Sequence, residues 1–315
     1  MRIKPLRGYR YGIGRERDVS KVVAPPYDQI SDETQAWLYA ASPDNVVRIS
    51  YPREPSGGGD RYLEARATLD RWLAEAAWTP EDRPAIYPYE QTYRVDGHEL
   101  RRQGFIALGE ASDYARGVVR PHERTHSGPK ADRLRLLQAT GADTGLLFML
   151  TADPGGRLLE ATTGAGEPVA VARDLRGELH RLWRITDAAA IARVQALMAD
   201  AEVTIADGHH RYETAVEYAR HHPAAADKLM AFFSLQAPGL TIFPNHRLVH
   251  GVAGFDLARF LEAARAWFDV APLGDPLGFH PQHRALAVVA GPAAAVLRLR
   301  DEAFERIAWP PGTSR

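Results

Sequence analysis

Two histidines and an arginine follow a glycine in the middle of the chain, in the string Gly208-His209-His210-Arg211. Alternating apolar residues before this string predict a strand, and apolar residues at i, i+3, i+4 and i+7 after it predict a helix. The string would then form the first turn of a helix, where unpaired backbone N–H groups and a partial positive charge favour an anion. Imidazole and guanidinium groups at this place indicate phosphate binding. The alternative is an ordinary strand–turn–helix unit with both histidines in solvent.

Asp207 directly precedes this string, and its charge would repel a phosphate. It either caps the helix or approaches the phosphate through Mg²⁺, and we favour the capping role. Adjacent side chains on a helix point about 100° apart. His209 and His210 therefore cannot both face one point, so we expect one to face a ligand and the other to pack against, or hydrogen-bond, a neighbouring loop.

A second group of polar residues lies at 121–133, in the string PHERTHSGPKADR. A loop with this much charge is often functional, although a solvated surface loop is the alternative. Glu123 is the candidate general base, or the group that positions an acceptor. The other candidates could bind a substrate carboxylate or phosphate: His122, Arg124, Thr125, Lys130 and Arg133. We expect this loop and the 207–211 turn to line one pocket.

The residues from His122 to His126 match the H-E-x-x-H motif of zinc proteases letter for letter. That motif requires a helix that places both imidazoles on one face. Pro121 precedes the string and Ser-Gly-Pro follows it at 127–129, so we expect no such helix. The sequence therefore predicts no metal ligands here.

The string Ala-Pro-Pro-Tyr-Asp at 24–28 is a third candidate. Two prolines stiffen the backbone and would aim Tyr27 and Asp28 at the rim of the same pocket. The alternative is a rigid loop that leads into a helix capped by Ser31.

Composition narrows the function classes. The chain has 315 residues, a formal net charge of −1 and no cysteine. Thiol catalysis, disulfides and cysteine-bound zinc are therefore excluded, and near-neutral charge argues against a nucleic-acid partner. The N-terminal residues lack the apolar core of a secretory signal, and no apolar run is long enough to cross a membrane. We expect a cytoplasmic protein that acts on a small molecule without contacting a membrane.

The elements that must position these residues are hairpins mixed with helices, which favours an α+β fold with mixed sheets and packed helices. Asp96-Gly97 and the turn at 174–177 each predict a hairpin. The run at 46–50 predicts a strand. Residues from Asp60 predict an amphipathic helix with five large side chains inward: Tyr62, Leu63, Leu69, Trp72 and Leu73.

We expect a loop at 111–129 and a helix from Lys130 to about Thr140. The three candidate segments all fall in the first part of the chain. We therefore assign a main domain to 1–250 and a C-terminal α+β extension to 251–315.

Three strings in order, VAPPYDQIS, PHERTHSGPKADRLRLLQAT and IADGHHRYETA, resemble a widespread prokaryotic family, domain-of-unknown-function family 1015. The resemblance covers about residues 1–250. Family members usually continue to a Pro-Gln-Lys-Ser-Thr motif that this chain lacks, which implies a truncated chain or a short variant. The resemblance gives a family and no established activity.

The string from Gly208 to Glu213 is also similar to the Gly-Cys-His-Arg loop of the ParB/sulfiredoxin-like superfamily. In that superfamily the loop lies at a helix N-terminus and holds nucleotide phosphates, which implies a ParB/sulfiredoxin-like nucleotide site here. Members include sulfiredoxins, ParB nucleotide switches and free-serine kinases. His209 stands where sulfiredoxin has its catalytic cysteine, so sulfiredoxin chemistry is excluded. The resemblance then implies a small-molecule kinase that uses ATP or ADP with Mg²⁺.

These inferences predict Mg²⁺-dependent phosphoryl transfer from a nucleotide to a small hydroxyl metabolite, with free serine as the acceptor that the kinase resemblance implies. Residues 207–211 would hold the phosphates, while His210 and Arg211 would offset charge on the transferred group. Two alternatives stay open: a non-catalytic nucleotide or metabolite sensor, and a metal-dependent hydrolase. The hydrolase would use four histidines: His122, His126, His209 and His210. The sequence leaves the acceptor, the nucleotide base and the oligomeric state undetermined.

Overall fold

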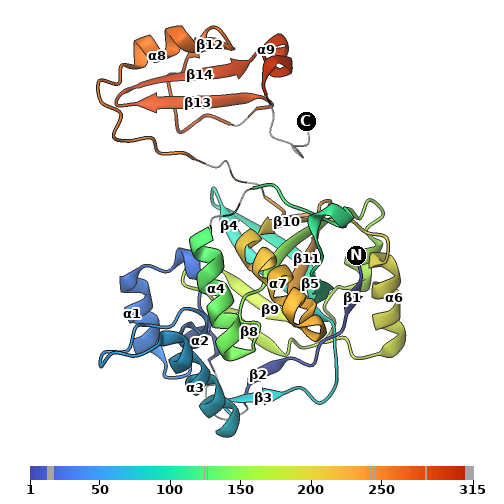
Figure 1. The fold of residues 1–315 in the computed structure, drawn as a ribbon. Helices are drawn as coiled ribbons and strands as arrows, with labels where there is room; N and C mark the ends of the chain where they lie inside the picture. The colour runs from blue at the N-terminus through green and yellow to red at the C-terminus, as the bar shows by residue number, and fades with distance from the viewer. Residues whose placement is uncertain are drawn as a thin grey trace. The chain divides into compact units, whose positions relative to one another are not determined.

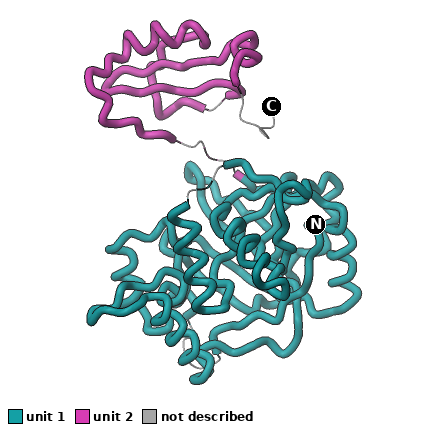
Figure 2. The backbone as a smooth tube through the Cα atoms, in the orientation of Figure 1, with its two compact units in different colours: residues 1–240 teal, residues 241–315 magenta. Residues whose placement is uncertain are grey.

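The chain divides into two compact units, Met1–Leu240 and Thr241–Arg315 (Figure 2). The structure is a computed structural model, and it describes residues 1–12, 18–123, 125, 127–241, 243, 246–280 and 282–308. Each unit has its own sheet and its own hydrophobic core.

The first unit contains, in chain order, β1 (Ile3–Lys4), β2 (Tyr9–Tyr11), the 3-10 helices η1 (Val19–Lys21) and η2 (Tyr27–Gln29), α1 (Asp32–Ala41), α2 (Val47–Ser50), α3 (Arg61–Ala74), β3 (Trp78–Pro80), β4 (Tyr87–Val95), β5 (His98–Glu110), η3 (Tyr114–Arg116), β6 (Val119–Arg120), α4 (Ser127–Thr140), β7 (Leu147–Thr151), α5 (Arg157–Ala161), β8 (Ala170–Arg173), β9 (Leu179–Leu182), α6 (Ala188–Met198), β10 (Val203–Asp207), α7 (His209–His221), η4 (Pro223–Ala225) and β11 (Asp227–Ser234).

A nine-stranded mixed sheet forms the centre of this unit, in the order β6-β10-β7-β11-β5-β4-β9-β8, with β1 beside β5 (Figure 1). β6 runs parallel to β10, and β7 runs parallel to β11, while β7 and β10 are antiparallel. One end of the sheet therefore brings together the C-terminal ends of β6 and β10 and the N-terminal ends of β7 and β11. We call this end the edge of the sheet. The residues that directly follow β6 and the turn before α7 both leave from that edge.

The main core lies between the central strands and the helices α6 and α7. Alternate strand residues point into it: Phe105, Leu147, Met149, Val203, Ile205, Met230 and Phe232. Tyr212 of α7 and Val194 and Met198 of α6 are fully buried against them. Each such burial stabilises the fold by about 1.5–3 kcal/mol. This packing fixes α7, and thereby its first turn, while α4 packs beside α7.

The α+β class and both predicted hairpins are confirmed. β4 pairs with β5 around Asp96 and Gly97, which have φ values of 50° and 80°, as a two-residue turn of this kind requires. β8 pairs with β9 across the turn at 174–177. Ser31 caps α1 by accepting a hydrogen bond from the Thr34 N–H.

The strand predicted at 46–50 is wrong, because this segment forms the short helix α2. The Asn45 side chain accepts a hydrogen bond from the Val47 N–H at 2.9 Å and donates to the carbonyls of Lys21 and Val23. These bonds fix a helical turn at the start of the segment. Local capping and the burial of Ile49 thus outweigh the strand preference of β-branched residues.

The predicted inward face of α3 is right for Tyr62, Leu69 and Trp72, which are buried, and wrong for two leucines. Leu63 is 65% exposed and Leu73 is 40% exposed. Successive helical residues point about 100° apart. Each leucine follows directly after an inward-facing aromatic residue, so it is turned away from the core.

The segment predicted as a loop at 111–129 contains η3 and β6, and α4 begins at Ser127 rather than Lys130. Gly128 and Pro129 lie in the first turn of α4, where the missing N–H of proline costs no helical hydrogen bond.

The second unit contains α8 (Leu257–Ala264), β12 (Phe268–Pro272), β13 (Ala285–Ala290), β14 (Ala293–Leu299) and α9 (Asp301–Arg306). Its three strands pair in the order β12-β14-β13 around a small core that contains Ala264, Ala295 and Leu297. Across the described residues of both units, every helix is too short or too polar to span a bilayer.

Candidate functional site

Gly208 directly precedes α7 and occupies its N-cap position, with φ 102° and ψ 27°. A Cβ atom at this position would lie 2.7 Å from Cδ2 of Leu147, which is fully buried. The position therefore needs glycine for both its backbone angles and its packing. Glycine offers no capping side chain, so the first N–H groups of α7 lack that partner.

The capping role predicted for Asp207 is wrong, because Gly208 takes that position. The Asp207 carboxylate instead lies 2.5 Å from Nη2 of Arg211. Arg211 also donates through Nη1 to the Leu146 carbonyl, and its side chain is 10% exposed. The guanidinium thus joins the first turn of α7 to the beginning of β7.

A second cation lies at the same edge of the sheet. Lys228, at the beginning of β11, donates to the carboxylate of Asp143 and, at 2.7 Å, to the Gly145 carbonyl. Burial lowers the pKa of Lys228, Asp143 opposes this effect, and the charge of Arg211 adds to the lowering. The positive charges of Arg211 and Lys228 therefore repel each other.

The loop after β6 contacts the first turn of α7 directly. The His122 N–H donates to Nε2 of His209 at 3.2 Å, and Nδ1 of His122 donates to the Ile205 carbonyl at 2.6 Å. Oε1 of Glu123 lies 3.0 Å from Nδ1 of His209. The His209 side chain is 1% exposed, whereas that of Glu123 is 49% exposed. A buried imidazole thus lies beside a carboxylate that solvent can reach, although its Nδ1 has no hydrogen-bond partner among the described residues.

The hydrogen bond that Nε2 of His209 accepts defines the tautomer of the neutral ring. Its donor is the backbone N–H of His122, so the ring hydrogen is on Nδ1, on the side of Glu123. Burial lowers the pKa of His209 against the opposing charge of Glu123, and His122 lowers it further. One ligand atom each from His122, Glu123 and His209 lies within 4.8 Å of the others. A protonated Nδ1 has no lone pair to offer a metal ion, so the absence of a metal ligand here stays our prediction.

The zinc-protease interpretation needs both histidines of the motif on one helix. His122 lies in a turn after β6, outside any helix. His126 is outside the described residues, as is the predicted substrate-binding residue Arg124.

Glu213 connects α7 to the start of α4. Its carboxylate accepts hydrogen bonds from Thr125 Oγ1 at 2.6 Å and from Lys130 Nζ at 2.9 Å. Burial tends to raise the pKa of Glu213, but these two bonds, with the charges of Lys130 and His210, hold it below its usual range. His210 therefore helps to lower the pKa of Glu213, while its neighbour His209 lies beside Glu123.

Tyr27 of the proline-rich segment lies against α4. The Arg133 guanidinium is 4.2 Å from the centroid of the Tyr27 ring, and its Nη1 donates to the Ser50 carbonyl at 2.5 Å. Burial raises the pKa of Tyr27, and Asp28 adds to this, while Arg133 and Arg211 oppose it. Asp28 itself is exposed.

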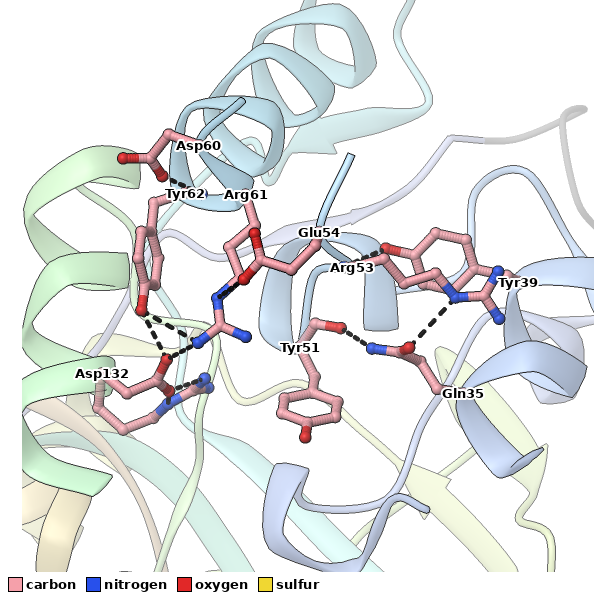
Figure 3. A network of polar contacts seen from close by, with 10 residues as sticks. Gln35, Tyr39, Tyr51, Arg53, Glu54, Asp60, Arg61, Tyr62 and Asp132 are labelled. Atoms are coloured by element: carbon pink, nitrogen blue, oxygen red, sulfur yellow. Dashed lines mark hydrogen bonds and ion pairs between the residues drawn. The ribbon is translucent and has the colours of Figure 1, made fainter. Parts of the chain in front are cut away.

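A polar network holds this part of α4 in place (Figure 3). Asp132 accepts hydrogen bonds from the Tyr62 hydroxyl at 2.8 Å and from Arg61 at 2.6 Å, and it pairs with Arg133. The buried Arg133 thus has its donors engaged within the protein. It positions the segment around Tyr27.

A cavity of about 510 Å³ lies next to these contacts, between η3, α4 and α7. Its lining is Ser112, Asp113, Tyr114, Lys130, Ala131, Leu134, Tyr212, Glu213, Thr214, Val216, Glu217 and Arg220. Glu213 therefore lines the cavity and also contacts Thr125, while Lys130 lines the cavity beside Glu213.

His122 and Glu123 lie against His209, and Arg133 lies against Tyr27, so described residues of the three segments contact one another. The cavity lining includes Lys130 but no residue of 207–211 or 24–28, so a shared pocket stays a prediction. Sequence reasoning did not assign roles to Glu213, Asp143 or Lys228. Glu213 lies four residues after His209, so helical spacing could have placed it near the turn. Asp143 and Lys228 meet across 85 positions of sequence, and no local pattern indicates that pairing.

A family model matches residues 3–310, and its description reads "Protein of unknown function (DUF1015)". The match extends through the second unit, beyond the three strings that carried the resemblance. Searches of curated proteins and of solved structures gave no significant match.

Proposed function

We propose that this chain, which belongs to the DUF1015 family, transfers a phosphoryl group from a nucleoside triphosphate or diphosphate to the hydroxyl group of a small metabolite, with Mg²⁺. Free serine is the leading acceptor, because the string from Gly208 to Glu213 resembles the phosphate loop of a superfamily that includes free-serine kinases. The β10–α7 turn would be the ParB/sulfiredoxin-like nucleotide site.

The placement of Glu123 beside the first turn of α7 is the observation that carries this proposal. The Glu123 side chain is 49% exposed, and its carboxylate lies 3.0 Å from the buried imidazole of His209. The adjacent turn offers backbone N–H groups without a capping side chain. A phosphate and an acceptor held this close together would react with a large entropic advantage.

The phosphates would bind the N–H groups after Gly208 and the positive end of the α7 dipole. His210 and Arg211 would offset charge that develops on the transferred group. Mg²⁺ supplies further charge neutralisation on the phosphate oxygens when bound, and the exposed carboxylate of Asp207 is an oxygen ligand of the kind it prefers.

In the transfer, the acceptor oxygen attacks the terminal phosphorus, and the bond from that phosphorus to its bridging oxygen breaks. The nucleotide leaves with one phosphate fewer, and the acceptor proton passes to Glu123. Lys130 and Thr125 both donate hydrogen bonds to Glu213, which lies one helical turn after His209 on α7. Lys130 and Arg124 would bind a carboxylate on the acceptor.

Phosphorus NMR tests the reaction with ATP, Mg²⁺ and a panel of small hydroxyl compounds that includes serine. We expect a new phosphate ester, and we expect Glu123→Gln to lower turnover by about 10²–10⁴-fold with nucleotide affinity nearly unchanged. Glu202→Gln is the matched control, since that carboxylate is 59% exposed and pairs with Arg120 away from the turn. Wild-type turnover in Glu123→Gln would reject its role as base. Nucleotide binding without any phosphorylated acceptor would favour the sensor.

A further inference from the structure

We propose that Asp174, Glu178 and His180, on the β8–β9 hairpin, bind a divalent transition-metal ion of the zinc type. One ligand atom from each side chain lies within 4.8 Å of the others. One imidazole nitrogen and two carboxylate oxygens are donors that zinc accepts, and three protein ligands leave a fourth position for water. This site shares no residue with the proposed phosphoryl-transfer site and does not depend on it.

His180 is oriented for such an ion by its neighbour on β4. Its Nδ1 lies 2.6 Å from the Tyr89 hydroxyl, and the two rings are stacked with centroids 6.0 Å apart. Nε2 is buried and has no hydrogen-bond partner among the described residues. A metal-binding histidine is characteristically fixed in this way, with a polar partner on one ring nitrogen and the metal on the other.

Asp174 presents one carboxylate oxygen to that nitrogen. Its Oδ1 accepts the N–H groups of Arg176 and Glu178, both at 2.9 Å. Its Oδ2 is left facing Nε2 of His180 at 3.4 Å. Two ligands at about 2.0–2.2 Å from a tetrahedral zinc ion lie about 3.3–3.5 Å apart. The observed separation therefore already suits two ligands of one ion.

Glu178 is held by residues of the central sheet. Gln91 of β4 donates to its Oε2, and Arg102 of β5 donates to Oε1 of Gln91 at 2.8 Å. The Glu178 carboxylate contributes the third ligand atom of the cluster. Each proposed ligand thus has a partner that fixes its orientation, as in metal sites whose outer partners tune affinity. The two carboxylates would also balance the charge of the ion.

The competing interpretation is a protonated His180 that forms an ion pair with Asp174, without a metal. Zinc titration of chelator-treated full-length protein by calorimetry separates the two. We expect one zinc per chain and a higher melting temperature with zinc. We expect His180→Gln and Asp174→Asn to lose both effects. Tyr89→Phe, which removes only the outer partner of His180, should weaken zinc binding by about 10–100-fold.

Two controls make the assignment specific. His209→Gln changes the other cluster of histidine and carboxylate, and His98→Gln changes an exposed histidine on the β4–β5 hairpin. Both should keep wild-type zinc binding. Circular dichroism checks that each variant folds. If His180→Gln does not fold, Asp174→Asn still tests the site, because its amide oxygen can keep the two backbone hydrogen bonds that Oδ1 accepts. Absence of zinc binding in the wild type, or wild-type binding in Asp174→Asn, would overturn the proposal in favour of the ion pair.

Discussion

His209 and His210 are adjacent in the sequence but act on different carboxylates. His209 is buried and faces Glu123, whereas His210 is partly exposed and acts on Glu213. This divergence follows from the 100° step between helical residues. In the proposed site, His209 would therefore be a positioning residue that lies behind Glu123, and Glu123 would face the acceptor.

The burial of His209 predicts a pH dependence of stability. Burial lowers its pKa below the usual 6.5 in the folded chain. Below about pH 6.5 the unfolded chain then binds more protons at this residue than the folded chain, so stability falls as the pH decreases. We predict that urea unfolding between about pH 7.5 and 5 gives a shallower pH dependence in His209→Gln than in the wild type. His98→Gln, at an exposed position, should keep the wild-type slope. Equal slopes in all three proteins would show that His209 is not a source of the dependence.

At the scale of elements, the β10–α7 connection places the candidate site. β10 is clamped between β6 and β7, and α7 is anchored by Tyr212, whose hydroxyl donates to the Ser112 carbonyl at 2.7 Å. The chain must therefore turn sharply between two fixed elements. Gly208 makes this turn with a positive φ and close packing on Leu147.

Replacement of Gly208 tests this geometry. Gly208→Ala should lose about 1–2 kcal/mol of stability to the left-handed backbone and about 1–3 kcal/mol more to overlap with the buried Leu147. Gly117→Ala is the matched control, since Gly117 has φ 71° and a Cβ atom there would meet nothing within 4 Å. It should show the backbone cost without the overlap. Urea unfolding of both variants measures the difference, and equal losses would mean that Leu147 yields without cost.

Sequence reasoning succeeded where the cause of a structure is local. The hairpin at Asp96-Gly97 and the cap at Ser31 are fixed by residues within a few positions. It failed at α2, where Asn45 bonds to carbonyls more than twenty residues away. It also assigned the cap to Asp207, because the packing that selects glycine at 208 comes from β7. In the site, the motif strings identified Glu123 and His209, but their mutual contact depends on the pairing of β6 with β10.

At the scale of the whole molecule, the three motif segments meet within the first unit although they are far apart in the sequence. Tyr27, Glu123 and His209 all belong to Met1–Leu240, as do Lys130 and Glu213. The second unit has its own sheet and core, and the family match covers both units. If the α7 turn holds phosphates, nucleotide binding should therefore be a property of the first unit.

Nucleotide binding by the full chain and by residues 1–240 tests this expectation. Ligand at about 100 times its dissociation constant would stabilise either protein by about 2.7 kcal/mol, which raises the melting temperature. We predict a similar rise with ATP and Mg²⁺ in both proteins.

Arg211→Ala should weaken binding by about 1.5–3 kcal/mol in calorimetry, because it removes a charge-assisted contact to phosphate. Arg66→Ala, in an exposed pair with Asp70 on α3, should leave the affinity unchanged. A rise in the full chain that is absent from a folded 1–240 fragment would assign part of the site to the second unit. No rise in either protein with ATP, ADP, GTP or CTP would leave the α7 turn as a purely structural connection.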